Sequence, residues 1–112
     1  MKPPLFDYVT PESVEDAVAA RATEEDSGLL AGGQSLIPTL NFRIANPAVL
    51  IDISRIEALK GIDVGATEIT VGAMARQRQV EKDDAVHRAN PLLREVLGNV
   101  AHVVVRNRGT VA

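Results

Sequence analysis

A glycine-rich segment in the first third of this sequence carries groups that could bind an anion. The segment consists of Ala31, Gly32, Gly33, Gln34 and Ser35. Consecutive glycines expose backbone N–H groups with no Cβ to hold a phosphate away from them. The Ser35 hydroxyl could donate one more hydrogen bond, and the Gln34 amide could reach a polar edge of the ligand. A strand-to-helix turn that merely needs a positive φ would have the same sequence, and the residues alone do not exclude that alternative.

A second group of polar residues beside a glycine lies at the end of the chain. It consists of Arg106, Asn107, Arg108, Gly109, Thr110 and Val111. We expect a tight turn to begin at Gly109, and Arg106 and Arg108 could neutralise or order a phosphate there. The alternative is an exposed polar loop that caps the preceding segment. Two such turns, separated in the sequence, suit a ligand with two phosphates.

The residues needed for several other chemistries are missing. Neither G-x-x-x-x-G-K-[ST] nor G-x-G-x-x-G occurs, which excludes a P-loop and the Rossmann dinucleotide fingerprint. There is no cysteine for a disulfide or an iron–sulfur cluster, and the only histidines, His87 and His102, are too widely separated to suggest a metal site. A net charge of -3 gives no electrostatic footprint for nucleic acid or an anionic membrane. No apolar run near the N-terminus is long enough for a signal peptide or a membrane span, so we expect a cytoplasmic protein.

The first half of the chain has the pattern of alternating helices and buried strands around the glycines. Proline and acidic residues after Thr10 predict a helix from Pro11 to Ala22. The apolar run LLA then predicts a short strand that leads into the glycines, and a short helical segment should follow Ser35. The run AVLIDI predicts a second buried strand.

The sequence pattern changes in the second half of the chain. We therefore place a subdomain boundary near residue 55, which divides the chain into residues 1–55 and 56–112. The stretch GIDVGATEITVGA predicts two short strands in a hairpin or a meander. The charged stretch RQRQVEKDDAVHR is typical of a solvated helical face, and Asn90-Pro91 should open a helix with an apolar stripe. Because the chain stops inside the turn expected at Gly109, we expect the second part to be truncated.

Three stretches, in their order and spacing, carry a resemblance to a known family. They are AGGQSLIPTLNFRIANPAVLIDI, ITVGA and VRNRGTV. The chain resembles the N-terminal part of the FAD-binding medium subunit of the molybdenum hydroxylases, the family of xanthine dehydrogenase and aerobic carbon monoxide dehydrogenase. The resemblance implies a two-subdomain α+β flavin domain of the vanillyl-alcohol oxidase (PCMH) type, of which this chain would be the N-terminal portion, with FAD extended between the subdomains.

The resemblance also implies roles for particular residues. Residues 31–35 would bind the FAD pyrophosphate through backbone amides, and Gly109, Thr110 and Val111 would begin a second loop that completes that grip and approaches the flavin. Gly72 and Ala73 match a third family segment. The chain departs from the family pattern in two places, with Ala112 where a glycine is usual and Met-Ala-Arg where small hydroxyl residues usually follow Ala73.

The implied activity is electron relay. A molybdenum-cofactor large subunit would oxidise the substrate, a [2Fe-2S] small subunit would carry the electrons, and FAD in this subunit would pass them to an acceptor. The flavin would be held noncovalently, and no residue of this chain is expected to act as an acid–base catalyst or a metal ligand.

Two other functions stay open from the sequence: a stand-alone flavoprotein oxidoreductase, and a truncated, noncatalytic interaction module. Truncation would leave apolar faces of a β-rich second half uncovered, so self-association of the chain is expected.

Overall fold

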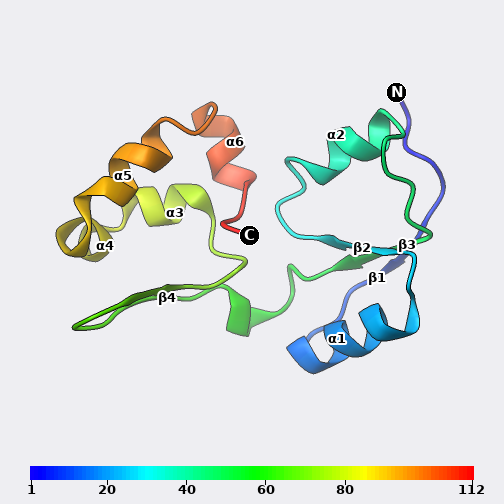
Figure 1. The fold of residues 1–112 in the computed structure, drawn as a ribbon, viewed down its shortest axis with the longest axis horizontal. Helices are drawn as coiled ribbons and strands as arrows, with labels where there is room; N and C mark the ends of the chain where they lie inside the picture. The colour runs from blue at the N-terminus through cyan, green and yellow to red at the C-terminus, as the bar shows by residue number, and fades with distance from the viewer. The chain divides into compact units, whose positions relative to one another are not determined.

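The computed structural model describes all residues from Met1 to Ala112, which divide into two compact units, Met1–Ala58 and Leu59–Ala112. Each unit contains both helices and strands (Figure 1), so the predicted mixture of the two is confirmed.

The first unit is built on a three-stranded parallel sheet. Its strands are β1 (Asp7–Val9), β2 (Ser27–Leu30) and β3 (Val49–Asp52), in the order β1-β3-β2. β3 lies in the centre because its apolar side chains can be buried on both faces of the sheet, and Leu50 and Ile51 are fully enclosed. Helices α1 (Val14–Thr23) and α2 (Leu36–Asn41) lie on opposite sides of the sheet (Figure 1).

The predicted start of the first helix is wrong by three residues. α1 begins at Val14 rather than Pro11, because the Ser13 side chain accepts a hydrogen bond from the Asp16 backbone N–H at 3.0 Å and caps the helix there. The short helix predicted after Ser35 and the buried strand predicted over AVLIDI are both present, as α2 and β3.

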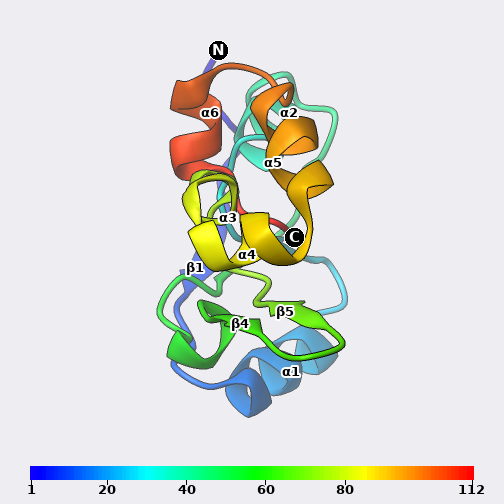
Figure 2. The same cartoon turned by 90° about the vertical axis from the view of Figure 1, so that its left-hand side faces the viewer.

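The second unit packs four short helices against a hairpin. β4 (Ile62–Val64) and β5 (Ile69–Val71) are antiparallel, which confirms the predicted hairpin, and a 3-10 turn at Glu57–Leu59 precedes them. The helices are α3 (Gln77–Lys82), α4 (Asp84–Ala89), α5 (Pro91–Gly98) and α6 (Val103–Arg108). Figure 2 shows α3 and α4 above the hairpin, where the buried side chains of Ala75, Val80 and Val86 form the core. The second half is therefore mainly helical and not β-rich.

The charged stretch at residues 76–88 is not one solvated helical face. It breaks into α3 and α4 at Asp83, whose carboxylate accepts hydrogen bonds from the backbone N–H groups of Ala85 and Val86, both at 2.9 Å. Val80 and Val86 are buried within it. The helix predicted to open at Asn90-Pro91 is present as α5, with the Asn90 side chain as its cap.

Candidate functional site

The glycine-rich segment at residues 31–35 forms the connection between β2 and α2 in the first unit. Gly33 has a φ of 73°, in the left-handed region that favours glycine. Its carbonyl accepts a hydrogen bond from the Ile37 N–H at 3.1 Å, and the Ser35 carbonyl accepts from both the backbone and the hydroxyl of Thr39. The segment is thus the strand, glycine turn and helix that the sequence predicts.

This turn leaves several donors without a partner in the chain. The backbone N–H groups of Gly33, Gln34 and Ser35 donate no hydrogen bond to another part of the protein, and neither does the exposed Ser35 hydroxyl. The Gln34 side-chain amide reaches only the Gly32 carbonyl, at 3.5 Å. Three consecutive N–H groups are therefore available to an anion or to water.

Neighbouring side chains give a second reason why position 33 is a glycine. A Cβ there would lie 3.2 Å from the Ile37 side chain and 3.4 Å from the Leu30 side chain. The alternative left open by the sequence, a turn that needs a positive φ, is therefore part of the explanation at this position.

The second predicted segment does not form a tight turn. Gly109 has a φ of -62° and a ψ of 132°, so the backbone is extended as it leaves α6. It pairs with residues 73–77: the Gln77 N–H donates to the Gly109 carbonyl at 2.9 Å, the Val111 N–H to the Ala75 carbonyl at 2.9 Å, and the Ala112 N–H to the Ala73 carbonyl at 3.2 Å. The structure thus brings two of the predicted site segments together within the second unit, 72–73 and 109–111, while residues 31–35 belong to the first.

Thr110 is held inside this pairing. Its side chain is buried, and its hydroxyl donates to the Ala112 carbonyl at 2.8 Å. The Thr110 carbonyl accepts from the side-chain amide of Gln77 at 3.4 Å, and the buried Oε1 of that amide has no hydrogen-bond partner. Nothing in the sequence singles out Gln77, because its contact depends on a residue 33 positions away.

Gly72 is required by the protein's own backbone. A Cβ on it would lie 2.2 Å from the Leu59 carbonyl oxygen and 2.6 Å from the Leu59 carbonyl carbon. The close approach is stabilised by hydrogen bonds from the Gly72 N–H to the Gly61 carbonyl and from the Met74 N–H to the Leu59 carbonyl, both at 2.8 Å. Met74 and Ala75, which replace the hydroxyl residues usual in the family, are buried core residues.

The two arginines proposed beside a phosphate have different environments. Arg106 is 7% exposed, and its guanidinium is engaged by Glu81 and by two backbone carbonyls. Arg108 is exposed. The Nε and Nη1 groups of Arg106 donate to acceptors inside the unit, and a contact between Arg106 and a phosphate stays a prediction.

No three side chains of a metal-binding kind gather anywhere in the chain, and no helix has both the length and the apolar character needed to cross a membrane. His102 precedes α6 as an exposed residue, and His87 lies in α4 with a buried Nδ1 that has no hydrogen-bond partner.

A comparison with known protein families decides what kind of domain this is. Residues 4–112 match the family described as the FAD binding domain in molybdopterin dehydrogenase. The chain belongs to this family. As a member of this FAD-binding family the chain takes FAD as its cofactor, and the resemblance inferred from the three sequence stretches is confirmed.

Several relatives match this FAD-binding domain over nearly its whole length. It is 42% identical to the carbon monoxide dehydrogenase medium chain of Hydrogenophaga pseudoflava, over 99% of this chain and 39% of that protein. It is 41% identical to the 6-hydroxypseudooxynicotine dehydrogenase complex subunit alpha of Paenarthrobacter nicotinovorans, over 99% of this chain and 38% of that protein. The solved structure of quinoline 2-oxidoreductase from Pseudomonas putida 86 matches with a TM-score of 0.95 and 40% identity, over 98% of this chain and 39% of that one. The chain therefore spans about two fifths of the length of these relatives.

Proposed function

We propose that this chain is the FAD-binding part of an electron-transfer subunit of a cytoplasmic molybdenum hydroxylase. In this proposal its partners are a molybdenum-cofactor large subunit and a [2Fe-2S] small subunit, and electrons from the iron–sulfur clusters leave through FAD to an acceptor. The family match and the medium-chain relatives support this assignment. Because the chain spans 39% of the carbon monoxide dehydrogenase medium chain, we propose that it is the N-terminal portion of a longer subunit with a two-subdomain PCMH-type domain.

The observation that carries the proposal is the glycine turn between β2 and α2. The pyrophosphate of FAD presents oxygen acceptors, and the unpaired N–H groups of Gly33, Gln34 and Ser35 are donors of matching chemistry. Ala31 and Gly32 would lead the chain into this contact. These residues fit the cofactor without an arginine, which agrees with the internal pairing of Arg106.

The second and third segments would contribute differently. The N–H groups of Gly109, Val111 and Ala112 are already bonded within the chain, so these residues would shape the site and would not supply further amide donors. The orphaned Oε1 of Gln77 is a buried acceptor beside Thr110, and it could accept a hydrogen bond from a hydroxyl of the cofactor. In this proposal Gly72 and Ala73 support the backbone that carries this acceptor.

The bound flavin would supply the redox chemistry. The chain itself would bind and orient the cofactor.

The test is FAD binding by the intact subunit that contains this chain, with Gly33 replaced by valine or asparagine. Valine is strained at a positive φ and should distort the turn, so FAD affinity should fall by about a hundredfold, a free-energy change of about 3 kcal/mol. Asparagine tolerates the left-handed region and keeps the N–H groups in place, so its affinity should stay within a few-fold of the wild type.

Gly61→Val is the matched control, because a Cβ at Gly61 would have no neighbour within 4 Å. Flavin-to-protein ratios from visible absorbance measure occupancy, and circular dichroism verifies folding. A folded Gly33→Val subunit that retains one FAD per chain would show that this turn does not bind the pyrophosphate.

A further inference from the structure

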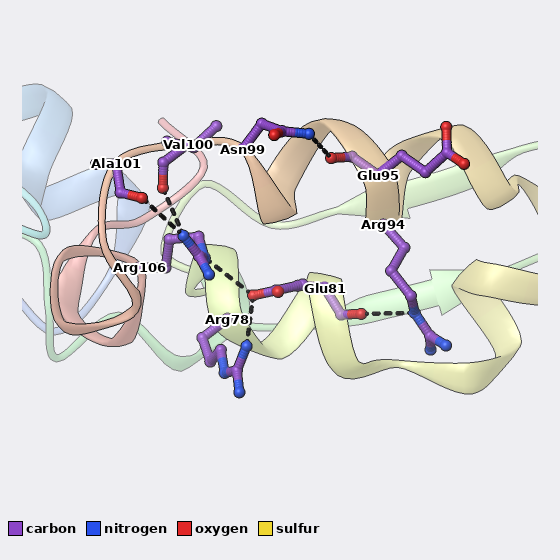
Figure 3. Close-up of polar contacts among 8 residues, drawn as sticks. All are labelled: Arg78, Glu81, Arg94, Glu95, Asn99, Val100, Ala101 and Arg106. Carbon is purple, nitrogen blue, oxygen red and sulfur yellow. Dashed lines mark hydrogen bonds and ion pairs between the residues drawn. The ribbon is translucent and has the colours of Figure 1, made fainter.

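The second unit contains a partly buried cluster of charged side chains centred on Glu81. Its carboxylate accepts a hydrogen bond from Arg78 at 2.9 Å and one from Arg106 at 3.1 Å, while its backbone carbonyl accepts from Arg94 at 2.9 Å. The Glu81 side chain is 13% exposed and that of Arg106 is 9% exposed. Figure 3 shows Glu81 on α3 between arginines that come from three different helices, α3, α5 and α6.

The donors of Arg106 that do not face Glu81 hold a strained turn. Its Nη1 donates to the carbonyls of Val100, at 2.7 Å, and Ala101, at 3.1 Å, in the connection between α5 and α6 (Figure 3). Ala101 has a φ of 46°, a left-handed conformation that is unfavourable for a residue with a Cβ. The guanidinium therefore compensates for this conformation by satisfying two carbonyls that the turn directs inward.

The pair of Glu81 and Arg106 also connects the two helices next to the extended segment at residues 109–112. Arg106 lies on α6, which ends at Arg108 and leads directly into that segment. Glu81 lies on α3, which begins directly after residues 73–76, the partners of that segment in the antiparallel pairing. The ion pair thus joins α3 and α6, the helices next to the two paired segments 73–76 and 109–112. A shift of α6 relative to α3 would therefore move Gly109, Thr110 and Val111.

We propose that Arg106, through Glu81 and the carbonyls of Val100 and Ala101, is a positioning residue that fixes the segment from Gly109 to Val111 for the flavin. This inference rests on the proposed function. The hydrogen bonds from Arg78 and Arg106 also lower the pKa of Glu81, so the carboxylate stays charged and the pair stays intact over the neutral range.

The experiment measures FAD binding by the intact subunit in which Arg106 is replaced by glutamine or by lysine. Arg106→Gln leaves the Ala101 turn and Glu81 without their shared donor, so the dissociation constant should rise about tenfold or more, and the visible circular dichroism of the bound flavin should change. Arg106→Lys keeps a charged donor beside Glu81 and should recover part of the affinity.

Two controls separate positioning from other roles. Arg88→Gln makes the same change of charge at an exposed residue of α4, and it should leave both the affinity and the flavin spectrum unchanged. Val86→Ala removes a buried core methyl pair from α4 and lowers stability, but well below its melting temperature it should leave the flavin spectrum unchanged. A spectrum that changes in Arg106→Gln and not in Val86→Ala therefore reports the position of the segment and not general destabilisation.

The salt dependence of FAD binding distinguishes a direct contact between Arg106 and the phosphate from a positioning role of Arg106. Because Arg106 faces acceptors inside the unit, the slope of affinity against salt should be the same in Arg106→Gln and in the wild type. A shallower slope in the variant would show that Arg106 contacts the phosphate and would overturn the inference. Wild-type affinity together with a wild-type flavin spectrum in Arg106→Gln would also overturn it.

A further variant keeps the test decisive if Arg106→Gln does not fold. Glu81→Gln keeps an acceptor for Arg106 but removes the charge, and it should weaken FAD binding about threefold with the same change of spectrum. An unchanged dissociation constant and spectrum in a folded Glu81→Gln subunit would refute the inference. A wild-type subunit that binds no FAD would instead refute the proposed function, so the two failures are distinguishable.

Discussion

Replacing Gly72 with alanine should destabilise the second unit severely, although the change adds only one methyl group. The new Cβ would lie 2.2 Å from the Leu59 carbonyl oxygen, and that neighbour is backbone and cannot rotate away. Ordinary contact begins at 3.4 Å, so the two chain segments must separate by about 1 Å. That separation would stretch the two 2.8 Å hydrogen bonds that join these segments, from Gly72 to Gly61 and from Met74 to Leu59.

The magnitude follows from these two effects. Two backbone hydrogen bonds contribute about 1 kcal/mol each, and overpacking of this kind costs about 1–3 kcal/mol, so the free energy of unfolding should fall by about 3–5 kcal/mol. Gly61→Ala is the control, because its Cβ would meet nothing within 4 Å, and the expected change is within about 0.5 kcal/mol.

Urea denaturation of the chain followed by far-ultraviolet circular dichroism measures both variants. Intrinsic fluorescence gives a separate signal from the first unit, since Tyr8 is the only tyrosine and there is no tryptophan. If Gly72→Ala unfolds at the same urea concentration as Gly61→Ala, the close approach of Gly72 to Leu59 is not a real constraint and the structural explanation of this glycine fails.

Three further predictions concern the first unit, the helix caps and the isolated chain. Burial raises the pKa of Asp52, but hydrogen bonds from Tyr8 and Ser54 outweigh it and the net pKa is lowered, so Tyr8→Phe should cost about 1 kcal/mol at neutral pH. Because the pKa of Asp52 is lower in the folded state, its carboxylate stabilises the fold at pH values above the unfolded pKa, and this stabilisation is lost as the pH falls through the folded pKa. A destabilisation by Tyr8→Phe that stays the same in acid would contradict the hydrogen bond between Tyr8 and the Asp52 carboxylate. Asp83→Ala should cost about 1 kcal/mol in thermal unfolding because it removes the α4 cap, whereas Asp63→Ala, at an exposed strand position, should be nearly neutral. Residues 1–112 alone should bind FAD weakly and self-associate through the exposed apolar side chains of α5 and α6. Light scattering measures the mass and flavin fluorescence measures the affinity, and a monodisperse monomer that binds FAD with micromolar affinity would contradict this prediction.

The elements that the sequence predicted correctly are those specified by local pattern. The continuous apolar run at residues 48–51 indicates a strand buried on both faces, and it forms most of the central strand β3. The hairpin followed from two β-rich runs around Gly65, and α5 from Asn90-Pro91, whose side chain and ring favour a helix start.

What the sequence analysis missed depended on a local helix cap and on a contact between distant residues. The stretch at 76–88 looked solvated because its charges are frequent, yet the cap formed by Asp83 breaks it and turns Val80 and Val86 inward. The sequence also gave no sign that Arg106 pairs with Glu81, because the two residues are 25 positions apart. No sequence pattern around Arg106 or around Glu81 indicates that these two side chains pair.

The glycines of the three predicted site segments show why a glycine motif alone cannot identify a ligand contact. Gly33 is required by a positive φ, Gly72 by the approach of the Leu59 carbonyl, and Gly109 lies buried in extended backbone with its N–H bonded to Val105 and its carbonyl to Gln77. The backbone groups of Gly72 and Gly109 are consumed by the chain's own pairing, whereas the N–H of Gly33 is not. Because a buried ligand oxygen needs a donor that the protein has not already used, we propose the backbone contact to a pyrophosphate at the first segment, whereas the glycines of the other two segments are explained by the packing and pairing of the second unit itself.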